Sequence, residues 1–356
     1  MTTRSIFITA AFLLTTGIVT KAQSTDSSAK NITVPIRFGI IPGLSTQGAA
    51  DIRTTSNFSL NLFGGRTGNV DGLELGSLFN IDRGNMQYVQ AAGWFNSVGG
   101  NMRGVQSAGL FNIVGGTASG VQSAGIFNMV KGNAVGLQSG GIYNYAGKNF
   151  SGLQSAGISN FTGGKMKGIQ VAGIVNYARH LKGLQIGLIN IADTSEGFHL
   201  GLINIVKKGY HKLFLHANEV MNANIAIKTG NPKLYNILIA GVNPGSEDKV
   251  FSYGYGLGRE ISLGKSFTIN PELTSQYLYL GNWHYHNWLS KFQVLINLRL
   301  TKNIALSGGP SFAVYYSDQL EAVKGYKFNI PSYNSFKLWN NNVTGWVGWT
   351  AGLTFF

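Results

Sequence analysis

The chain contains no cysteine, so disulfide bonds and lipidation at a mature N-terminal cysteine are both excluded. Charge is also scarce: 12% of the residues are charged, and 14 acidic residues stand against 28 basic ones. A basic surplus can indicate a nucleic-acid partner, but no basic cluster lies within a recognisable nucleic-acid module. We therefore expect no nucleic-acid partner, and an anionic membrane surface fits the surplus better.

Long apolar runs are missing after residue 22, where no stretch reaches the roughly 20 apolar residues of a membrane-spanning helix. Only helices and closed barrels satisfy their backbone hydrogen bonds in lipid, so a membrane form of this protein must be a β-barrel. Residues 1–22 have the layout of a secretory signal peptide, with Arg4, an apolar core and a small-residue site ending at Ala22. We expect cleavage after Ala22 and export.

Glycine, by contrast, is abundant, with 49 residues, and aromatic residues make up 12% of the chain. A disordered chain would be poor in aromatics, and an ordinary soluble domain would hold fewer glycines. The glycine density and the absence of a 3.6-residue period also exclude a helical fold. The sequence therefore predicts an all-β protein.

A repeat with a conserved pattern of amides occupies residues 72–206. Long units of sixteen residues read GxQxxGxxN, and the last units, spaced by fourteen, read GxQxGxxN and GxHxGxxN. The nine asparagines are Asn80, Asn96, Asn112, Asn128, Asn144, Asn160, Asn176, Asn190 and Asn204. The glutamines of the long units are Gln90, Gln106, Gln122, Gln138, Gln154 and Gln170, and Glu74 takes this position in the first unit.

The short unit has one residue fewer between its glutamine and its asparagine. Side chains alternate across a strand, so losing one residue would move everything downstream to the other face. We therefore expect the long unit to contain a β-bulge near Ala108 and Gly109 that absorbs the extra residue. With this bulge, Gln106 and Asn112 would lie on opposite faces of the strand.

Two architectures can use such a unit. Each unit can be one strand and one tight turn of an antiparallel transmembrane barrel, because about 9 to 11 tilted residues cross a bilayer. Alternatively, each unit can be one coil of a β-solenoid, in which identical residues stack and the asparagines form a ladder. The regular spacing favours the solenoid, whereas the strand length and the flanking sequence favour the barrel.

The flanking segments read as barrel strands. Residues 23–71 contain two candidate strands, and residues 207–356 contain eight segments of alternating character, joined by tight turns and longer links in alternation. This asymmetry is typical of outer-membrane barrels, whose short turns face the periplasm. Trp339, Trp346 and Trp349 would supply part of an interfacial aromatic girdle.

Counting every candidate strand gives nineteen, whereas bacterial single-chain barrels have even numbers. We therefore predict an antiparallel transmembrane β-barrel of about 18–20 strands that includes the repeats. The alternatives are a barrel of about 10 strands that carries the repeats as a β-solenoid, and a wholly soluble β-protein.

Several motifs together resemble a known family. The segments "GIIPGLSTQG", "NFSLNLFGG", the GxQxAGxxN units and "LYNILIAGVNP" followed by "FSYGYGLG" resemble surface-repeat outer-membrane proteins of Bacteroidota and spirochaetes. The resemblance covers nearly the whole mature chain and implies the cell outer membrane as its location, but no activity. The final residue, Phe356, resembles the recognition signal of barrel-assembly substrates. The expected partners are outer-membrane lipid, lipopolysaccharide and the barrel-assembly machinery.

No catalytic, cofactor-binding or metal-binding residues can be assigned. His284 and His286 could face a metal from one strand, but the sequence offers no third ligand beside them. Gly254, Gly256 and Gly258 imitate a nucleotide loop, but no helix follows, and we interpret them as strand glycines beside bulky neighbours. Histidine, serine and aspartate form no recognisable catalytic motif, so we expect no enzyme and no cofactor.

Three functions remain open. A pore or passive transport channel would line its lumen with the glutamine rows, although these amides can equally satisfy one another. The alternatives are a non-conducting surface scaffold or adhesin and a barrel enzyme. Any small-molecule ligand stays unknown, because fold alone does not define function.

Overall fold

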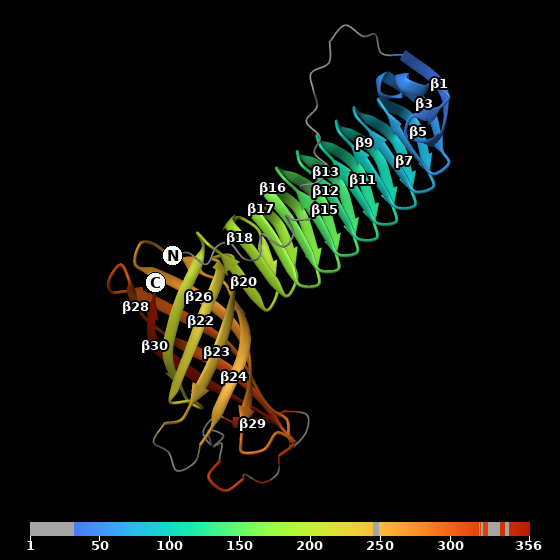
Figure 1. Ribbon diagram of the computed structural model, residues 1–356. Coiled ribbons are helices and arrows are strands. Elements are labelled where there is room, and N and C mark those ends of the chain that lie inside the picture. The colour runs from blue at the N-terminus through green and yellow to red at the C-terminus, as the bar shows by residue number, and fades with distance from the viewer. Residues whose placement is uncertain (1–31, 245–248, 320, 322, 327–334, 339–341) are drawn as a thin grey trace, which may run out of the picture.

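The computed structural model describes residues 32–244, 249–319, 321, 323–326, 335–338 and 342–356. The predicted signal peptide and Trp339 lie outside these residues. Strands are almost the only regular secondary structure of the described residues, and they form two sheets, one per domain, which confirms the all-β prediction (Figure 1). The only helical element among the described residues is the short 3-10 helix η1 (Gly48–Arg53).

The first sheet contains twenty strands. They are β1 (Ile32–Ile41), β2 (Leu44–Ser45), β3 (Thr54–Asn61), β4 (Gly64–Thr67), β5 (Asn69–Gly76), β6 (Phe79–Asp82), β7 (Met86–Ala92), β8 (Phe95–Val98), β9 (Met102–Ala108), β10 (Phe111–Val114), β11 (Ala118–Ala124), β12 (Phe127–Val130), β13 (Ala134–Gly140), β14 (Tyr143–Ala146), β15 (Phe150–Ala156), β16 (Ser159–Ala172), β17 (Val175–Ile186), β18 (Ile189–Ser195), β19 (Phe198–Leu200) and β20 (Ile203–Val206).

Each repeat forms one coil of a β-solenoid. A seven-residue strand such as β9 is followed by a corner and a four-residue strand such as β10, and each strand pairs in parallel with its counterpart in the next coil. The pairing sets Gln106 against Gln122 and Asn112 against Asn128. The solenoid of the alternative architecture is therefore correct, and the barrel of 18–20 strands is wrong, because identical units pair in parallel with their counterparts instead of antiparallel. The separate barrel has eight wall strands and not about ten.

The solenoid begins before the repeats. Strands β1 and β3 pair in parallel, with Val34 opposite Ser56, and β3 continues into β5. The described part of residues 23–71 therefore forms the first coils and not barrel strands. Alternation of apolar and polar residues is common to both kinds of strand, so the pattern alone could not separate them.

The structure has a corner between two strands at the place where the sequence predicted a β-bulge within one strand. At Gly109 the chain turns from β9 into β10, so the inward alternation restarts and both Gln106 and Asn112 are fully buried inside the coil. The short unit loses its residue at the same corner: Ile186 still pairs with Val171, and Ile189 still pairs with Val175. The deletion is tolerated because the corner, and not a strand, becomes shorter.

Apolar side chains fill the remaining interior of the coils. One cluster contains Met86, Val98, Met102, Val114, Ala118, Val130, Ala134, Ala146, Phe150, Met166, Ala178, Leu181 and Ala192. On the outside of the four-residue strands, aromatic rings of successive coils stack with centroids 4.8–5.2 Å apart, from Phe79 to Tyr143.

The second sheet closes into a barrel. Its strands are β21 (Tyr210–Asn218), β22 (Ala223–Asn231), β23 (Leu234–Val242), β24 (Phe251–Gly258), β25 (Ile261–Ser262), β26 (Phe267–Tyr279), β27 (Asn287–Arg299), β28 (Ile304–Ser317), β29 (Ser335–Leu338) and β30 (Val343–Phe355). Leu215 of β21 pairs with Leu353 of β30, which joins the first and last strands. Leaving out the short β25 and β29, eight antiparallel strands form the wall, and they match the eight segments predicted after residue 207.

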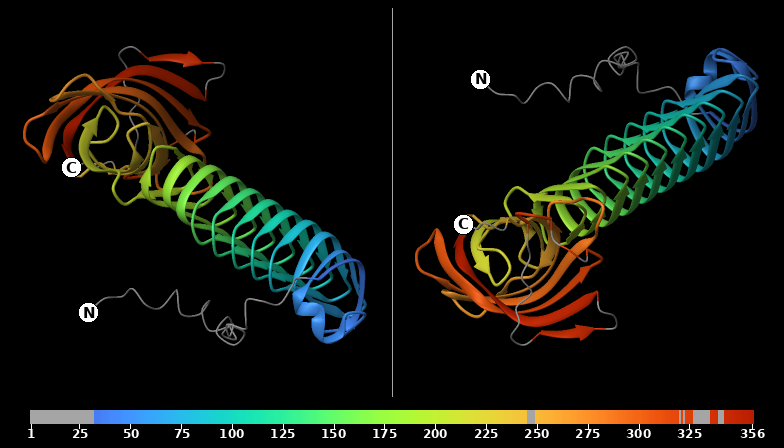
Figure 2. Two further views of the ribbon diagram at one scale, coloured as in Figure 1. Left: turned by 90° about the horizontal axis from the view of Figure 1, so that it is seen from above. Right: turned by 90° about the horizontal axis from the view of Figure 1, so that it is seen from below.

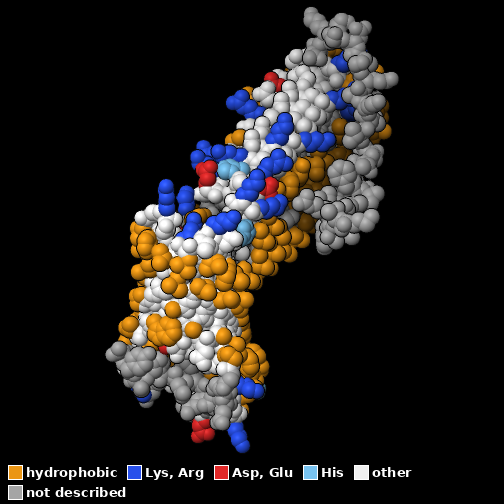
Figure 3. Space-filling view, turned by 90° about the vertical axis from the view of Figure 1, so that its left-hand side faces the viewer, with side chains coloured by type: hydrophobic (Ala, Val, Ile, Leu, Met, Phe, Trp, Pro, Cys, Tyr) orange, Lys and Arg blue, Asp and Glu red, His pale blue; other side chains and the backbone are white. Residues whose placement is uncertain are grey.

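The barrel wall has an apolar outer face. Large side chains such as Ile227, Leu273, Ile296 and Val347 are 49–58% exposed, and they alternate with buried inward residues. On the face turned to the viewer in Figure 3, hydrophobic side chains gather on the barrel wall near the end that meets the solenoid and in patches farther from it. Trp349 lies on this outer face, as the girdle prediction requires, but Trp346 is completely buried inside, because its position on β30 has the opposite parity.

The solenoid meets one end of the barrel. The chain enters at Tyr210 and finishes at Phe355 on the same side, as the pairing of β21 with β22 and β30 shows. The wall strands at this end are joined across residues 232–233, 259–266 and 300–303, whereas β28 ends at Ser317 and β30 begins at Val343 at the far end. Viewed along the vertical of Figure 1, the solenoid extends sideways from the barrel rim (Figure 2). No helix in the described residues is long and apolar enough to span a membrane.

Candidate functional site

Two ladders of amide side chains run through the solenoid. Each asparagine donates from Nδ2 to the Oδ1 atom of the next coil, as from Asn112 to Asn128 at 2.9 Å. The same Nδ2 also donates to a backbone carbonyl, that of Ser123 at 2.8 Å. Each glutamine donates in the opposite direction, from Gln122 Nε2 to Gln106 Oε1 at 2.9 Å. The amides therefore satisfy one another, and the hypothesis that they line a channel is wrong.

Each amide ladder begins at a buried charged side chain in the first coils: a cation for the asparagines and an anion for the glutamines. The Arg37 guanidinium donates to Asn61 Oδ1 at 2.6 Å, and Asn61 Nδ2 donates onward to Asn80 at 2.8 Å. At the start of the other ladder, Gln90 Nε2 donates to a carboxylate oxygen of Glu74 at 2.7 Å. The oxygen ends of the asparagines face the cation, and the nitrogen ends of the glutamines face the anion, which is the favourable orientation for each row of dipoles.

The charged cluster that surrounds these ladder ends is closed to solvent. Arg37 forms a bidentate pair with Asp51 at 2.8 and 2.9 Å, and Glu74 accepts hydrogen bonds from Ser59 and Thr67. Burial and the neighbouring Glu74 raise the pKa of Asp82 well above its usual range. A perturbed carboxyl can indicate catalysis, but Arg37, Glu74 and Asp82 are at most 1% exposed. The cluster caps the solenoid and offers no access to a substrate.

The barrel interior is filled with paired polar groups. Lys228 and Glu272 form an ion pair, and Tyr235 donates to the same carboxylate at 2.7 Å. Farther from the solenoid, Lys291 pairs with Glu219 at 2.9 Å. These four charged side chains are all 1–2% exposed. An eight-stranded barrel encloses just enough space for its own side chains, and these residues occupy it.

The remaining sequence candidates assemble no site. His284 and His286 lie in the connection between β26 and β27, where their backbone N–H groups donate to Asn282 and Asp318. Within the described residues, no three His, Cys, Asp or Glu side chains gather as a metal site would require.

The glycines of β24 give room to bulky neighbours, as interpreted from the sequence. A Cβ atom on Gly258 would lie 2.4 Å from the Tyr235 ring, and one on Gly254 would lie 2.6 Å from the Gln276 side chain. Gly254, Gly256 and Gly258 lie on one antiparallel strand and are followed by no helix, so they form no nucleotide loop.

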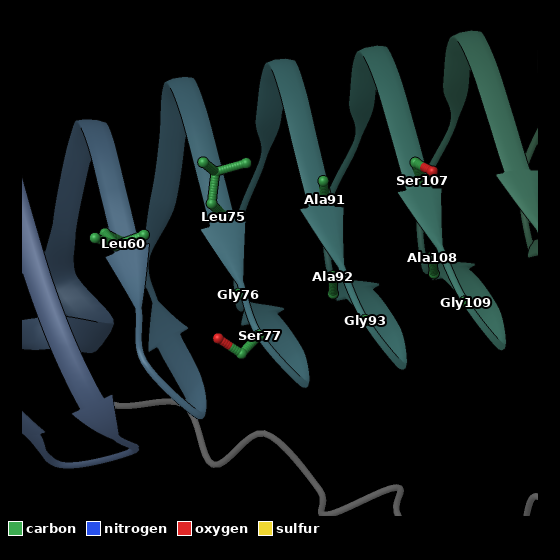
Figure 4. Close-up of a pocket in the computed structure, with 10 residues that line it drawn as sticks. All are labelled: Leu60, Leu75, Gly76, Ser77, Ala91, Ala92, Gly93, Ser107, Ala108 and Gly109. Atoms are coloured by element: carbon green, nitrogen blue, oxygen red, sulfur yellow. The ribbon is translucent and has the colours of Figure 1, made fainter.

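A shallow groove crosses the outside of the first coils (Figure 4). Its lining contains Leu60, Leu75, Gly76, Ser77, Ala91, Ala92, Gly93, Ser107, Ala108 and Gly109. Small side chains and corner glycines make it concave, but its lining contains no charged group. Specific small-molecule sites combine apolar walls with a few placed polar groups, so this groove lacks the features that would select a small polar ligand.

The junction between the solenoid and the barrel was not predictable from motifs. The carbonyl oxygen of Gly201 accepts hydrogen bonds from Asn236 Nδ2 at 2.7 Å and from the Tyr255 hydroxyl at 2.9 Å. Both side chains project outward from the barrel wall, so the last coil lies against that wall. The unusual Glu74 in a glutamine position was the one signal in the sequence that pointed to the buried charges of the solenoid.

No family model matches the chain, and neither a curated protein nor a solved structure matches it. The resemblance to surface-repeat outer-membrane proteins therefore stays a prediction. The protein has two parts with different surfaces. One is a barrel with an apolar wall and an interior filled by side chains, and the other is a solenoid that contacts one end of the barrel.

Proposed function

We propose that this protein is an outer-membrane scaffold, in which the barrel is a non-conducting anchor that holds the solenoid at the membrane. The observation that carries the proposal is the combination of an apolar outer wall with an interior closed by the Lys228–Glu272 and Lys291–Glu219 pairs. An exposed apolar wall of this kind fits lipid. Among the described residues, no accessible group of side chains supports a catalytic role.

A channel is the function that the barrel supports least. Conduction through eight strands would need the buried ion pairs to open, and breaking one leaves an uncompensated buried charge at a cost of about 3–5 kcal/mol. The wide lumen that a pore requires is typical of barrels of 16 or more strands.

The topology supports a periplasmic solenoid. Bacterial barrels place short turns in the periplasm and long loops outside the cell. The wall strands are joined across residues 232–233, 259–266 and 300–303 at the solenoid end and across residues 219–222, 243–250, 280–286 and 318–342 at the opposite end, so the longest connection lies away from the solenoid. We therefore propose that the solenoid extends into the periplasm instead of displaying the repeats at the cell surface.

The solenoid suits a scaffold because its surface repeats at a fixed interval. Parallel strands lie about 4.8 Å apart, so nine coils present equivalent side chains over about 40 Å. The amide ladders hold each coil to its neighbours, which keeps this spacing rigid. Such an array can position a partner or a surface without chemistry of its own.

Three measurements test the proposal. Fractionation should place the mature protein in the outer membrane as a heat-modifiable band, and recovery in the soluble periplasm would contradict it. Purified protein in a planar bilayer should stay silent at high dose, whereas stable unitary conductance would restore the channel hypothesis.

Orientation can be tested with single cysteines, because the chain has none of its own. On intact cells, a membrane-impermeant maleimide should label Lys324→Cys in the long connection but not Lys148→Cys on the solenoid. Permeabilising the outer membrane should then expose Lys148→Cys. Labelling of both on intact cells would place the solenoid at the surface.

A further inference from the structure

The corner of every coil carries a large apolar side chain that faces solvent. This row follows the corner glycines along one long edge of the solenoid, and Leu110, Ile174, Leu188 and Leu202 are 38–49% exposed. Contiguous exposed apolar surfaces of this length mark contact with a partner or a membrane. The row contains Leu78, Trp94, Leu110, Ile126, Ile142, Ile158, Ile174, Leu188 and Leu202.

A neighbouring outward row is apolar at both ends of the solenoid. It begins with Leu60 and Leu75 in the first coils and becomes apolar again towards the barrel. In the middle coils it consists of serines, up to Ser155, which pairs with Val171 in the next coil. Val171 pairs with Ile186, and Ile186 pairs with Leu200 in the last coil. The last two of these side chains are 38% and 40% exposed. These outward side chains are therefore not needed for the core, and at this end they extend the exposed apolar surface to the place where the solenoid meets the barrel.

The junction brings this apolar end of the solenoid to the level of the barrel wall. Asn236 and Tyr255, which bind Gly201, stand two and three residues from the short-turn ends of β23 and β24. At about 3.4 Å per residue, these positions are within about 10 Å of the rim. Leu200 and Leu202 flank Gly201 and therefore lie beside the edge of the apolar wall.

Basic side chains lie on the edge of the solenoid opposite the apolar corner row. Residues 83–192 contain no Asp or Glu. Their basic side chains include Lys131 and Lys148, which lie in the connections on the edge away from the corners, and Lys165, which lies at the corresponding place within β16. Among the described residues these three lysines have no ion-pair partner. Figure 3 shows basic side chains along one flank of the solenoid and a hydrophobic flank that continues into the barrel wall.

We infer that the barrel-proximal corners of the solenoid, at Ile174, Leu188 and Leu202, insert into the leaflet at the short-turn end of the barrel. This inference rests on the proposed membrane anchor. An apolar face opposite a basic face, placed at the edge of a hydrocarbon layer, is the arrangement of elements that lie in a membrane interface. The lipid contact would fix the tilt of the solenoid in addition to the hydrogen bonds at the junction.

The test uses single cysteines that carry a nitroxide in phosphatidylcholine and phosphatidylglycerol vesicles. Ile174→Cys, Leu188→Cys and Leu202→Cys sample the corner row near the barrel, and Leu110→Cys samples the same row far from it. Lys165→Cys reports the basic edge, and Ile227→Cys reports the barrel wall. The five apolar positions are 38–49% exposed, so the label should not disturb folding. A heat-modifiability gel checks the folding of each variant.

Collision with oxygen, relative to a polar nickel chelate, measures contact with lipid. We expect this ratio to increase from Leu110→Cys through Ile174→Cys and Leu188→Cys to Leu202→Cys, which should approach the value at Ile227→Cys. Lys165→Cys should stay at the value of an aqueous site.

Three results would overturn the inference. Aqueous values at the three proximal corners, with a lipid value at Ile227→Cys, would leave the anchor intact and refute the insertion. Protection from both reagents at those corners would indicate a protein partner instead of lipid. An aqueous value at Ile227→Cys would refute the anchor itself.

Discussion

Asn204, the last amide of the asparagine ladder, donates from Nδ2 to the Oδ1 atom of Asn236 on the outer wall of the barrel. The barrel therefore supplies the acceptor that a further coil would have supplied. One chain of side-chain hydrogen bonds thus runs from the buried guanidinium of Arg37, through every repeat, to the barrel.

This arrangement predicts that Asn236→Leu loosens the junction without unfolding either domain. The substitution removes the acceptor for Asn204 and one donor to Gly201, and an unsatisfied buried polar group costs about 1–3 kcal/mol. Distances between spin labels at Val135→Cys and Lys302→Cys should spread over a wider range in this variant. Tyr253→Phe on the neighbouring barrel strand β24, where the side chain is 54% exposed, is the matched control and should leave the distribution unchanged. A distribution as narrow as that of the parent would show that the amide contact does not hold the junction.

Parallel stacking predicts that the number of coils can change by one. Deleting residues 120–135 joins Ser119 to Gly136, which already pairs with Gly120, so like still stacks on like. In a solenoid every coil runs in the same direction, and stability falls by about the contribution of one coil. We expect similar folded yields in the membrane for this deletion and for the two-unit deletion 120–151. Failure of the one-unit deletion alone would indicate antiparallel pairing of the repeats.

The sequence specified the repeat, the all-β class and the eight barrel strands, because each depends on periodicity within a segment. It did not specify how segments pair. A ten-residue alternating unit satisfies either an antiparallel barrel or a parallel coil, and Gln106 could not be assigned to a face without knowing that the chain turns at Gly109. Nor could a single sequence show that Asn236, a residue of the barrel, completes the ladder.

Backbone strain at one position predicts a stabilising substitution. Tyr88 has a φ of 74°, in a row where Gly104 and Gly120 have φ of 125° and 127°. A non-glycine residue in the left-handed region costs about 1–2 kcal/mol, and Tyr88 is 63% exposed, so it loses little packing when shortened. Tyr88→Gly should raise the thermal midpoint of the solenoid, measured by circular dichroism in detergent.

The reverse substitution in the same row should be strongly unfavourable. A Cβ atom on Gly120 would lie 1.9 Å from the carbonyl oxygen of Gly104, so Gly120→Ala must displace the backbone of a neighbouring coil. Ser119→Ala, at the adjacent exposed position, serves as the control and should change the midpoint little. Equal midpoints for Tyr88→Gly and the parent would show that the positive φ costs nothing here.

A histidine in the last coil predicts how the stability of the solenoid depends on pH. His199 occupies the ladder position opposite Gln185, is 1% exposed, and contacts Ser195 Oγ through Nε2 at 2.8 Å. Burial lowers the pKa of His199 from its usual 6.5 to about 4. Between these values the unfolded chain binds a proton that the folded chain does not, so the free energy of unfolding decreases as pH falls from 6.5 to 4. The loss reaches about 3 kcal/mol, at about 1.4 kcal/mol per pKa unit.

His199→Gln should remove this dependence and extend the glutamine ladder. The Oε1 atom of Gln185 and the Nδ1 atom of His199 are both buried without a hydrogen-bond partner, and a glutamine Nε2 at position 199 could donate to Gln185. Urea unfolding of the variant and the parent should therefore diverge as pH falls from 6.5 to 4, with the variant more stable throughout. Asp82 has the opposite effect, because its pKa is raised in the folded chain. Its contribution to the free energy of unfolding is lost as pH rises above 3.8, the usual pKa of the carboxyl. Both proteins contain Asp82, so the difference between their free energies of unfolding reports His199 alone. If this difference did not change with pH, His199 would bind its proton equally in the folded and unfolded chains.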